Sequence, residues 1–96
     1  MELALFARFH AKDGMEAQVE AALAEQVPKV RPEPGCLAID AYRAKRDPRL
    51  FFIFSRWRDE AAFDIHAELP DTARFVERME PLIDHPFEAA RASRIG

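Results

Sequence analysis

Apolar and aromatic positions are densest between Leu50 and Trp57, in the stretch LFFIFSRW. Successive strand side chains point to opposite faces, so the odd-numbered residues from Phe51 to Trp57 share one face and the even-numbered residues from Leu50 to Arg56 share the other. Both faces are largely apolar, which is typical of a strand in the middle of a sheet with cover on two sides. The pattern therefore predicts a central strand here.

Three further strands are predicted from alternating apolar positions, over residues 1–10, 36–45 and, more weakly, 87–95. Within residues 36–45, alternation places Cys36 on the same face as Tyr42. The link from residue 46 to residue 49 is short, so the strands on either side of it are expected to form an antiparallel hairpin.

Apolar residues spaced three and four apart predict helices over residues 15–31, from Asp59 to Pro70, and over residues 71–83. Asp59 suits the N-cap position, because its carboxylate can accept hydrogen bonds from the first-turn N–H groups. Pro28 has no backbone donor and is expected to kink the first helix or loosen its last turn.

The predicted order of elements is βαββ(αα)β, which is the ferredoxin-like plan of an α+β domain with an antiparallel sheet and helices on one face. A chain of 96 residues fits one domain, residues 1–96. The helix-free face of this sheet also carries apolar residues. A homodimer with two sheets packed face to face is expected to cover it, at roughly 25 cal/mol per Å² of apolar surface buried.

Composition excludes several functional classes. The net charge of −3 gives no electrostatic basis for binding nucleic acid. No stretch is long and apolar enough for a transmembrane helix, and residues 1–10 lack the features of a signal peptide. The single cysteine, Cys36, has no partner for an internal disulfide and is interpreted as a small buried side chain. These observations favour a soluble, cytoplasmic protein.

Two residues at the junction of the central strand and the following helix are candidates for chemistry. His66 is either a general base toward a phenolic proton, since histidine exchanges protons near neutral pH, or a half-buried side chain bonded to the backbone. Trp57 either lines a cavity and stacks on a planar ring or is a core residue at a strand end. His10, His66 and His85 lack the spacing of metal ligands, so no metal site is expected.

Other side chains around these two are candidates for contacting a substrate. Tyr42 is a polar residue on an otherwise apolar strand and could hydrogen-bond a substrate oxygen. The phenylalanines form core or dimer interface by default, and they form a binding site only if part of their volume is left unfilled. This group comprises Phe51, Phe52, Phe54, Phe63 and Phe75.

Nearly the whole chain resembles the antibiotic biosynthesis monooxygenase (ABM) family of dimeric α+β barrel proteins. The most specific matches are Glu33-Pro34-Gly35-Cys36, Trp57-Arg58-Asp59, and His66 nine residues after Trp57. The resemblance implies a homodimer of ferredoxin-like subunits with a cavity between sheet and helices in each. It also implies, as in some members, oxidation of polycyclic phenols or quinols by O₂ without a metal or bound cofactor.

The sequence departs from the family at informative positions. The haem-degrading branch uses an Asn on the first strand, a Trp on the second helix and a His on the third, where this chain has Ala7, His66 and Val76. A haem oxygenase role is therefore not expected. Many relatives carry a Glu two residues before the Trp, and this chain has Ser55 there.

The leading hypothesis is a cofactor-independent monooxygenase or quinol oxidase acting on a small planar phenol or quinol. In it His66 and Trp57 are catalytic, and the substrate contacts Tyr42, Phe51, Phe63 and Phe75. The alternative is a non-catalytic or stress-related dimer that binds a small hydrophobic molecule. A third hypothesis is a structural partner whose cavity is filled.

Overall fold

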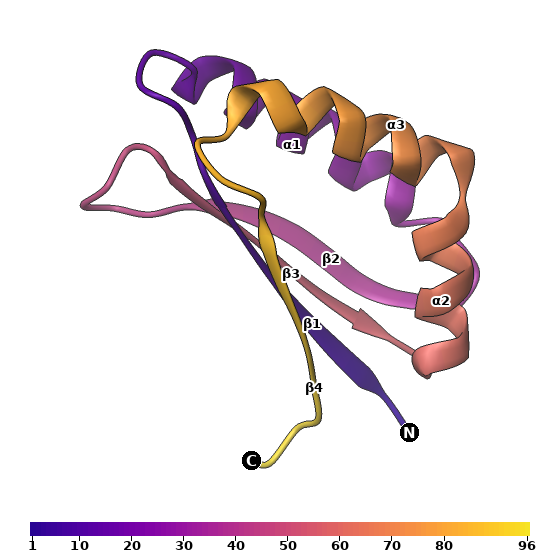
Figure 1. Ribbon diagram of the computed structural model, residues 1–96. Coiled ribbons are helices and arrows are strands. Elements are labelled where there is room, and N and C mark those ends of the chain that lie inside the picture. The colour runs from indigo at the N-terminus through magenta and orange to yellow at the C-terminus, as the bar shows by residue number, and fades with distance from the viewer.

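Four strands form one antiparallel sheet in the order β2-β3-β1-β4, and three helices cover one of its faces (Figure 1). The computed structural model describes all of residues 1–96. Along the chain the elements are β1 (Leu3–His10), α1 (Glu16–Val30), β2 (Cys36–Arg43), β3 (Leu50–Trp57), α2 (Glu60–Glu68), α3 (Pro70–Met79), the 3₁₀ turn η1 (Glu80–Leu82) and β4 (Glu88–Ala92). The predicted ferredoxin-like α+β order is confirmed.

The boundaries of some elements differ from the sequence predictions, and proline accounts for one of these differences. The α-helix predicted over residues 71–83 begins at Pro70 and ends at Met79, followed by η1. Pro81 cannot donate a backbone hydrogen bond, which accounts for the change from an α-helix to a 3₁₀ turn. Helix α1 continues past Pro28, and the last turn is held against the core by Val27 and Val30, both buried.

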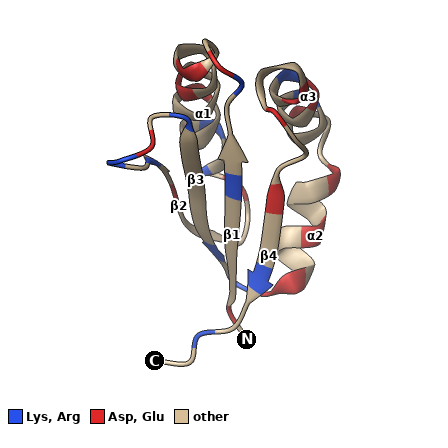
Figure 2. Ribbon diagram, turned by 60° about the vertical axis from the view of Figure 1, so that its left-hand side comes forward, with Lys and Arg blue, Asp and Glu red and all other residues tan.

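Strand β3 lies between β1 and β2, and its buried side chains form part of the core of the domain. Leu3 of β1 and Cys36 of β2 both pair with Trp57, which fixes the register of the three strands. Side chains on the helix-covered face of β1 and β3 alternate as predicted and are buried. The opposite face, called here the back face, is more open, and the Phe6 side chain on it is 52% exposed. The strands carry fewer charged residues than the helices do (Figure 2).

A bulge in β2 overturns the predicted placement of Cys36. Cys36 pairs with Trp57 and Ala38 pairs with Arg56, so one extra residue, Leu37, lies between them. Because a bulge resets the alternation of a strand, Cys36 lies on the helix-covered face and Tyr42 lies on the back face. Cys36 packs against the core there but is only half-buried, where the sequence analysis expected a buried side chain. Burial raises the pKa of its thiol, and the nearby Glu33 raises it further.

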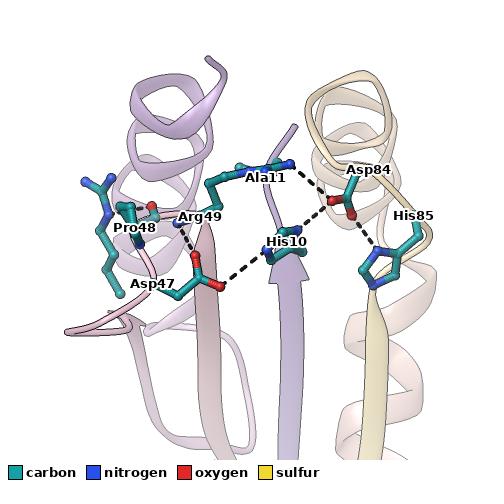
Figure 3. Close-up of polar contacts among 8 residues, drawn as sticks. His10, Ala11, Asp47, Pro48, Arg49, Asp84 and His85 are labelled. Atoms are coloured by element: carbon teal, nitrogen blue, oxygen red, sulfur yellow. Dashed lines mark hydrogen bonds and ion pairs between the residues drawn. The ribbon is translucent and has the colours of Figure 1, made fainter. Parts of the chain in front are cut away.

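Asp84 joins the segments that meet at one end of the sheet (Figure 3). Its carboxylate accepts from His10 Nδ1 at 2.6 Å, from Arg49 at 3.4 Å and from the adjacent His85. Its backbone N–H donates to the carbonyl of His10 at 2.9 Å. The hydrogen bond from His10 holds the pKa of the Asp84 carboxyl below its usual range. Asp84 therefore ties β1 and the start of β3 to the link before β4.

No helix in the protein combines the length and the apolar character needed to cross a bilayer.

Candidate functional site

A cavity of about 320 Å³ lies between the helix-covered face of the sheet and helices α2 and α3. Its walls are mainly apolar and come from the four strands, the three helices and the segment that leads into β4. Among the lining residues are Leu5, Ala7, Phe9, Ile53, Ser55, Phe63, His66, Phe75, Val76 and Phe87. It is called here the His66 cavity. The third hypothesis, which required a filled interior, is not favoured by this open space.

His66 contributes a polar group to the wall of the cavity, and its partner is Glu33. His66 Nδ1 lies 2.7 Å from Glu33 Oε1, and the two side chains are only 12% and 14% exposed. The other ring nitrogen, Nε2, makes no hydrogen bond within the protein and is not a buried unsatisfied atom. Nε2 is therefore not sealed from solvent and has no partner within the protein, and His66 is one of the residues that line the cavity.

Glu33 is the residue that the sequence analysis did not assign. It lies in the turn between α1 and β2, where Glu33 N donates to the carbonyl of Val30 and Cys36 N donates to the carbonyl of Glu33. Gly35 adopts a φ of 84°, which few residues other than glycine adopt readily. The turn packs against the start of α2, and this contact places Glu33 beside His66. The Glu33-Pro34-Gly35-Cys36 motif was the available signal for this residue.

The start of α2 is set by its predicted cap. Asp59 Oδ1 accepts from the N–H of Ala62 at 2.8 Å, as expected of an N-cap. This hydrogen bond lowers the pKa of the Asp59 carboxyl. The cap fixes where the helix begins, and Phe63 and His66 then follow on one helical face toward the sheet.

Trp57 lies behind His66 and does not line the cavity. It is fully buried, its ring centroid is 4.7 Å from that of His66, and the two planes are inclined by 32°. Its indole N–H donates to Ser55 Oγ at 3.0 Å, and Phe63 meets it edge-on with centroids 5.6 Å apart. The structure thus supports the interpretation of Trp57 as a core residue. It supports His66 from behind and cannot stack on a ligand in the cavity.

The predicted substrate-contacting residues divide into two groups. Phe63 and Phe75 line the cavity beside His66. Tyr42 and Phe51 do not: both border a separate hollow of about 310 Å³ between α1 and β2. Tyr42 lies on the back face, where it pairs with Phe52 of β3, and Phe51 is buried four residues along β3 from Ser55. The structure therefore does not place Tyr42 or Phe51 where a substrate beside His66 would contact them.

The remaining polar side chains of the cavity wall already have partners. Ser55 accepts from Trp57, Thr72 donates to the backbone carbonyl of His66 at 2.7 Å, and Gln26 donates to Asp71 at 3.1 Å. No three His, Cys, Asp or Glu side chains come together in an arrangement suited to a metal ion. The chemistry available to a bound molecule is therefore centred on His66 Nε2.

The fold and this site define a ferredoxin-like α+β domain with one apolar cavity and a histidine in its wall. The sequence profile of the antibiotic biosynthesis monooxygenase family matches residues 3–78, and the chain belongs to this family.

Solved structures agree with that assignment. The chain is similar to PA3566 from Pseudomonas aeruginosa, with 29% identity, a TM-score of 0.90, and coverage of 99% of this chain and 95% of that one. It is similar to a protein described as an antibiotic biosynthesis monooxygenase, with 28% identity, a TM-score of 0.90, and coverage of 98% and 99%. Rv0793 from Mycobacterium tuberculosis shares the fold, with 23% identity, a TM-score of 0.92, and coverage of 100% and 97%.

Proposed function

We propose that the protein is a cofactor-independent monooxygenase of the ABM type that oxidises a small planar phenol or quinol with O₂. One observation carries this proposal: His66 lies in the wall of an apolar cavity with Nδ1 bonded to Glu33 and Nε2 accessible. An apolar cavity of about 320 Å³ suits a fused aromatic ring system. A single basic nitrogen in its wall suits a substrate with one acidic hydroxyl.

The proposed reaction begins with proton transfer from the substrate hydroxyl to His66 Nε2. The resulting anion is electron-rich and transfers an electron to O₂, and the radical pair combines to form a carbon–oxygen bond. The proton held by His66 returns to the peroxide to give a hydroperoxide. The hydrogen left on the same carbon is then lost as a proton while the O–O bond breaks, and the released hydroxide takes up that proton and leaves as water. Anthrone enters this sequence through its enol tautomer, which has the hydroxyl, and one oxygen atom of O₂ then becomes the new ketone while the other becomes water. A quinol instead yields the quinone and hydrogen peroxide.

The experiment is O₂ uptake with anthrone and with menadiol, using the wild type, His66→Ala and a control. Removing a general base is expected to lower the turnover rate about 10²-fold to 10⁴-fold. His85→Ala is the matched control, because His85 lies outside the cavity and should leave turnover unchanged. The proposal fails if the wild type consumes no more O₂ than buffer, or if His66→Ala matches the wild type.

A second candidate is a dimer that binds a small hydrophobic molecule without converting it. The observation that favours it is the absence of Trp57 and Tyr42 from the cavity, which leaves His66 as the principal polar contact for a ligand. This candidate predicts that 1-naphthol raises the melting temperature by mass action, with no product formed. Multiple-turnover product release would exclude it.

We also propose that two copies associate through the back face. Phe6 is 52% exposed there, and Tyr42 is 53% exposed. The ring of Phe6 also pairs with that of Phe54, with centroids 5.1 Å apart, which makes the apolar patch continuous across β1 and β3. Covering such a patch is favourable at roughly 25 cal/mol per Å².

The oligomeric state tests this proposal by sedimentation at micromolar concentration. The wild type is expected to sediment as a dimer and Phe6→Asp as a monomer, because a charge would be buried at the interface. Ile65→Asp is the matched control, since Ile65 is 67% exposed on α2 and away from the back face. A wild-type monomer under these conditions would refute the proposal.

A further inference from the structure

We propose that Glu33 is a positioning residue for His66, which holds the imidazole in the Nδ1–H tautomer and stabilises its protonated form. This inference rests on the proposed function, because it concerns how His66 would accept a proton. Glu33 does not line the cavity. Any effect that it has on a bound molecule therefore passes through the imidazole ring.

The tautomer follows from the chemistry of the two partners. An ionised carboxylate only accepts hydrogen bonds, so the nitrogen 2.7 Å from Glu33 Oε1 has to be the donor. In neutral His66 the proton is then on Nδ1, and the lone pair is on Nε2, the nitrogen that has no partner within the protein. Without the carboxylate, the ring is free to place its proton on Nε2, where it would no longer be a base toward a ligand.

The stabilisation of charge follows from the proximity of the Glu33 carboxylate, which lies 2.7 Å from Nδ1. Both side chains are largely removed from solvent, at 12% and 14% exposed, so water screens their interaction weakly. Neither side chain makes another ion pair, since the nearby Arg31 pairs with Asp40 instead. When Nε2 takes a proton, the imidazolium therefore has one counter-charge, Glu33.

The placement of Glu33 is fixed before any ligand binds. Its backbone N–H and carbonyl are both used in the turn, and the N–H of Arg58 donates to the carbonyl of Gly35 at 2.8 Å. The Trp57 ring also packs against the imidazole, with centroids 4.7 Å apart and the planes tilted by 32°, and limits its rotation. The ring is thus held by a carboxylate and an aromatic ring, and Nε2 is left without a partner in the protein.

Two variants separate the parts of this proposal. Glu33→Gln keeps the shape and removes the charge, and Glu33→Ala removes both the charge and the acceptor. Glu68→Gln is the matched control, because Glu68 is exposed on α2 and makes no hydrogen bond or ion pair through its side chain. Circular dichroism and thermal melting establish that each variant is folded before it is compared.

The first readout is the ¹⁵N NMR spectrum of the His66 imidazole, which reports the tautomer without any turnover. The wild type and Glu68→Gln are expected to show neutral His66 protonated on Nδ1, and Glu33→Ala is expected to shift the population toward Nε2–H. The second readout is steady-state O₂ uptake. We expect Glu33→Gln to lower kcat about 10-fold to 100-fold, as for other residues that orient a functional ligand, with KM unchanged.

The outcomes distinguish this inference from the proposed function. If the wild type turns over no substrate but Glu33→Ala changes the tautomer, the proposed function fails and the positioning role of Glu33 stands. If Glu33→Ala keeps the Nδ1–H tautomer, or if both variants keep the wild-type kcat in an active enzyme, the positioning role is overturned. In the background of His66→Ala, substitution of Glu33 is expected to cause no further loss of kcat.

Discussion

Replacing Gly35 by alanine tests the contact that brings Glu33 to His66. Gly35 has a φ of 84°, and a Cβ built on it would lie 2.5 Å from the Cβ of Ala62 in the first turn of α2. Gly14 has the same φ, but nothing lies within 4 Å of its added Cβ. The two substitutions therefore share the backbone cost and differ only in the collision.

The expected magnitudes follow from these two terms. A non-glycine residue in the left-handed region costs roughly 1–2 kcal/mol, and this applies to both positions. Overpacking a well-filled site costs about 1–3 kcal/mol more, and this applies to Gly35 alone. Ala62 is only 3% exposed, and the carbonyl of Gly35 is bonded to the N–H of Arg58, so the turn cannot move away freely. We expect Gly35→Ala to lower the free energy of unfolding by about 2–5 kcal/mol, and Gly14→Ala to lower it by about 1–2 kcal/mol.

The assay is urea unfolding at one protein concentration, comparing the free energy of unfolding of both variants with that of the wild type. Adding Ala62→Gly to Gly35→Ala removes the Cβ that the new alanine would collide with. The double variant should therefore regain the free energy of unfolding lost to the collision, less about 1 kcal/mol for placing glycine in a helix. Equal losses for the two single variants, within about 0.5 kcal/mol, would refute the account of this turn.

Further predictions concern the sheet end, the core and the cavity. The low pKa of Asp84 means that its carboxylate stabilises the fold above the ordinary carboxyl pKa of about 3.9, and that this stability is lost as the pH falls through the lower folded-state pKa. Asp84→Asn should therefore lower the melting temperature at pH 7, and the difference in melting temperature between variant and wild type should decrease below about pH 3.9. A difference that stays constant with pH would contradict this. Trp57→Ala should lower the free energy of unfolding by about 3–5 kcal/mol in urea, since Trp57 is fully buried, and a loss under about 1 kcal/mol would contradict its core position. Val76→Phe should fill the cavity and abolish saturable binding of 1-naphthol in calorimetry while the protein stays folded; unchanged affinity would place the ligand elsewhere.

Local patterns were sufficient to predict most of the fold. The residues from Phe51 to Trp57 alternate as their sequence indicates, and Asp59 caps the helix that it precedes. These features depend on neighbours along the chain, so a single sequence contains them. The order of the elements and the short hairpin link then leave few arrangements, and the ferredoxin-like sheet is among them.

The site was less predictable because its contacts depend on packing between distant segments. Glu33 and His66 are 33 residues apart, and their contact requires the turn before β2 to meet α2. The bulge at Leu37 places Cys36 on the helix-covered face, opposite to Tyr42, which strict alternation could not indicate. Trp57 shares the helix-covered face with Ser55 as predicted, but the rings of neighbouring side chains cover it and separate it from the cavity.

The most direct test of the account is a crystal structure of the protein with 1-naphthol, soaked or co-crystallised without oxygen turnover. The account predicts the ring system in the His66 cavity between Phe63 and Phe75, with the hydroxyl oxygen about 2.6–3.2 Å from His66 Nε2. A ring bound only on the back face or in the hollow between α1 and β2, or a hydroxyl that points away from His66, would contradict it.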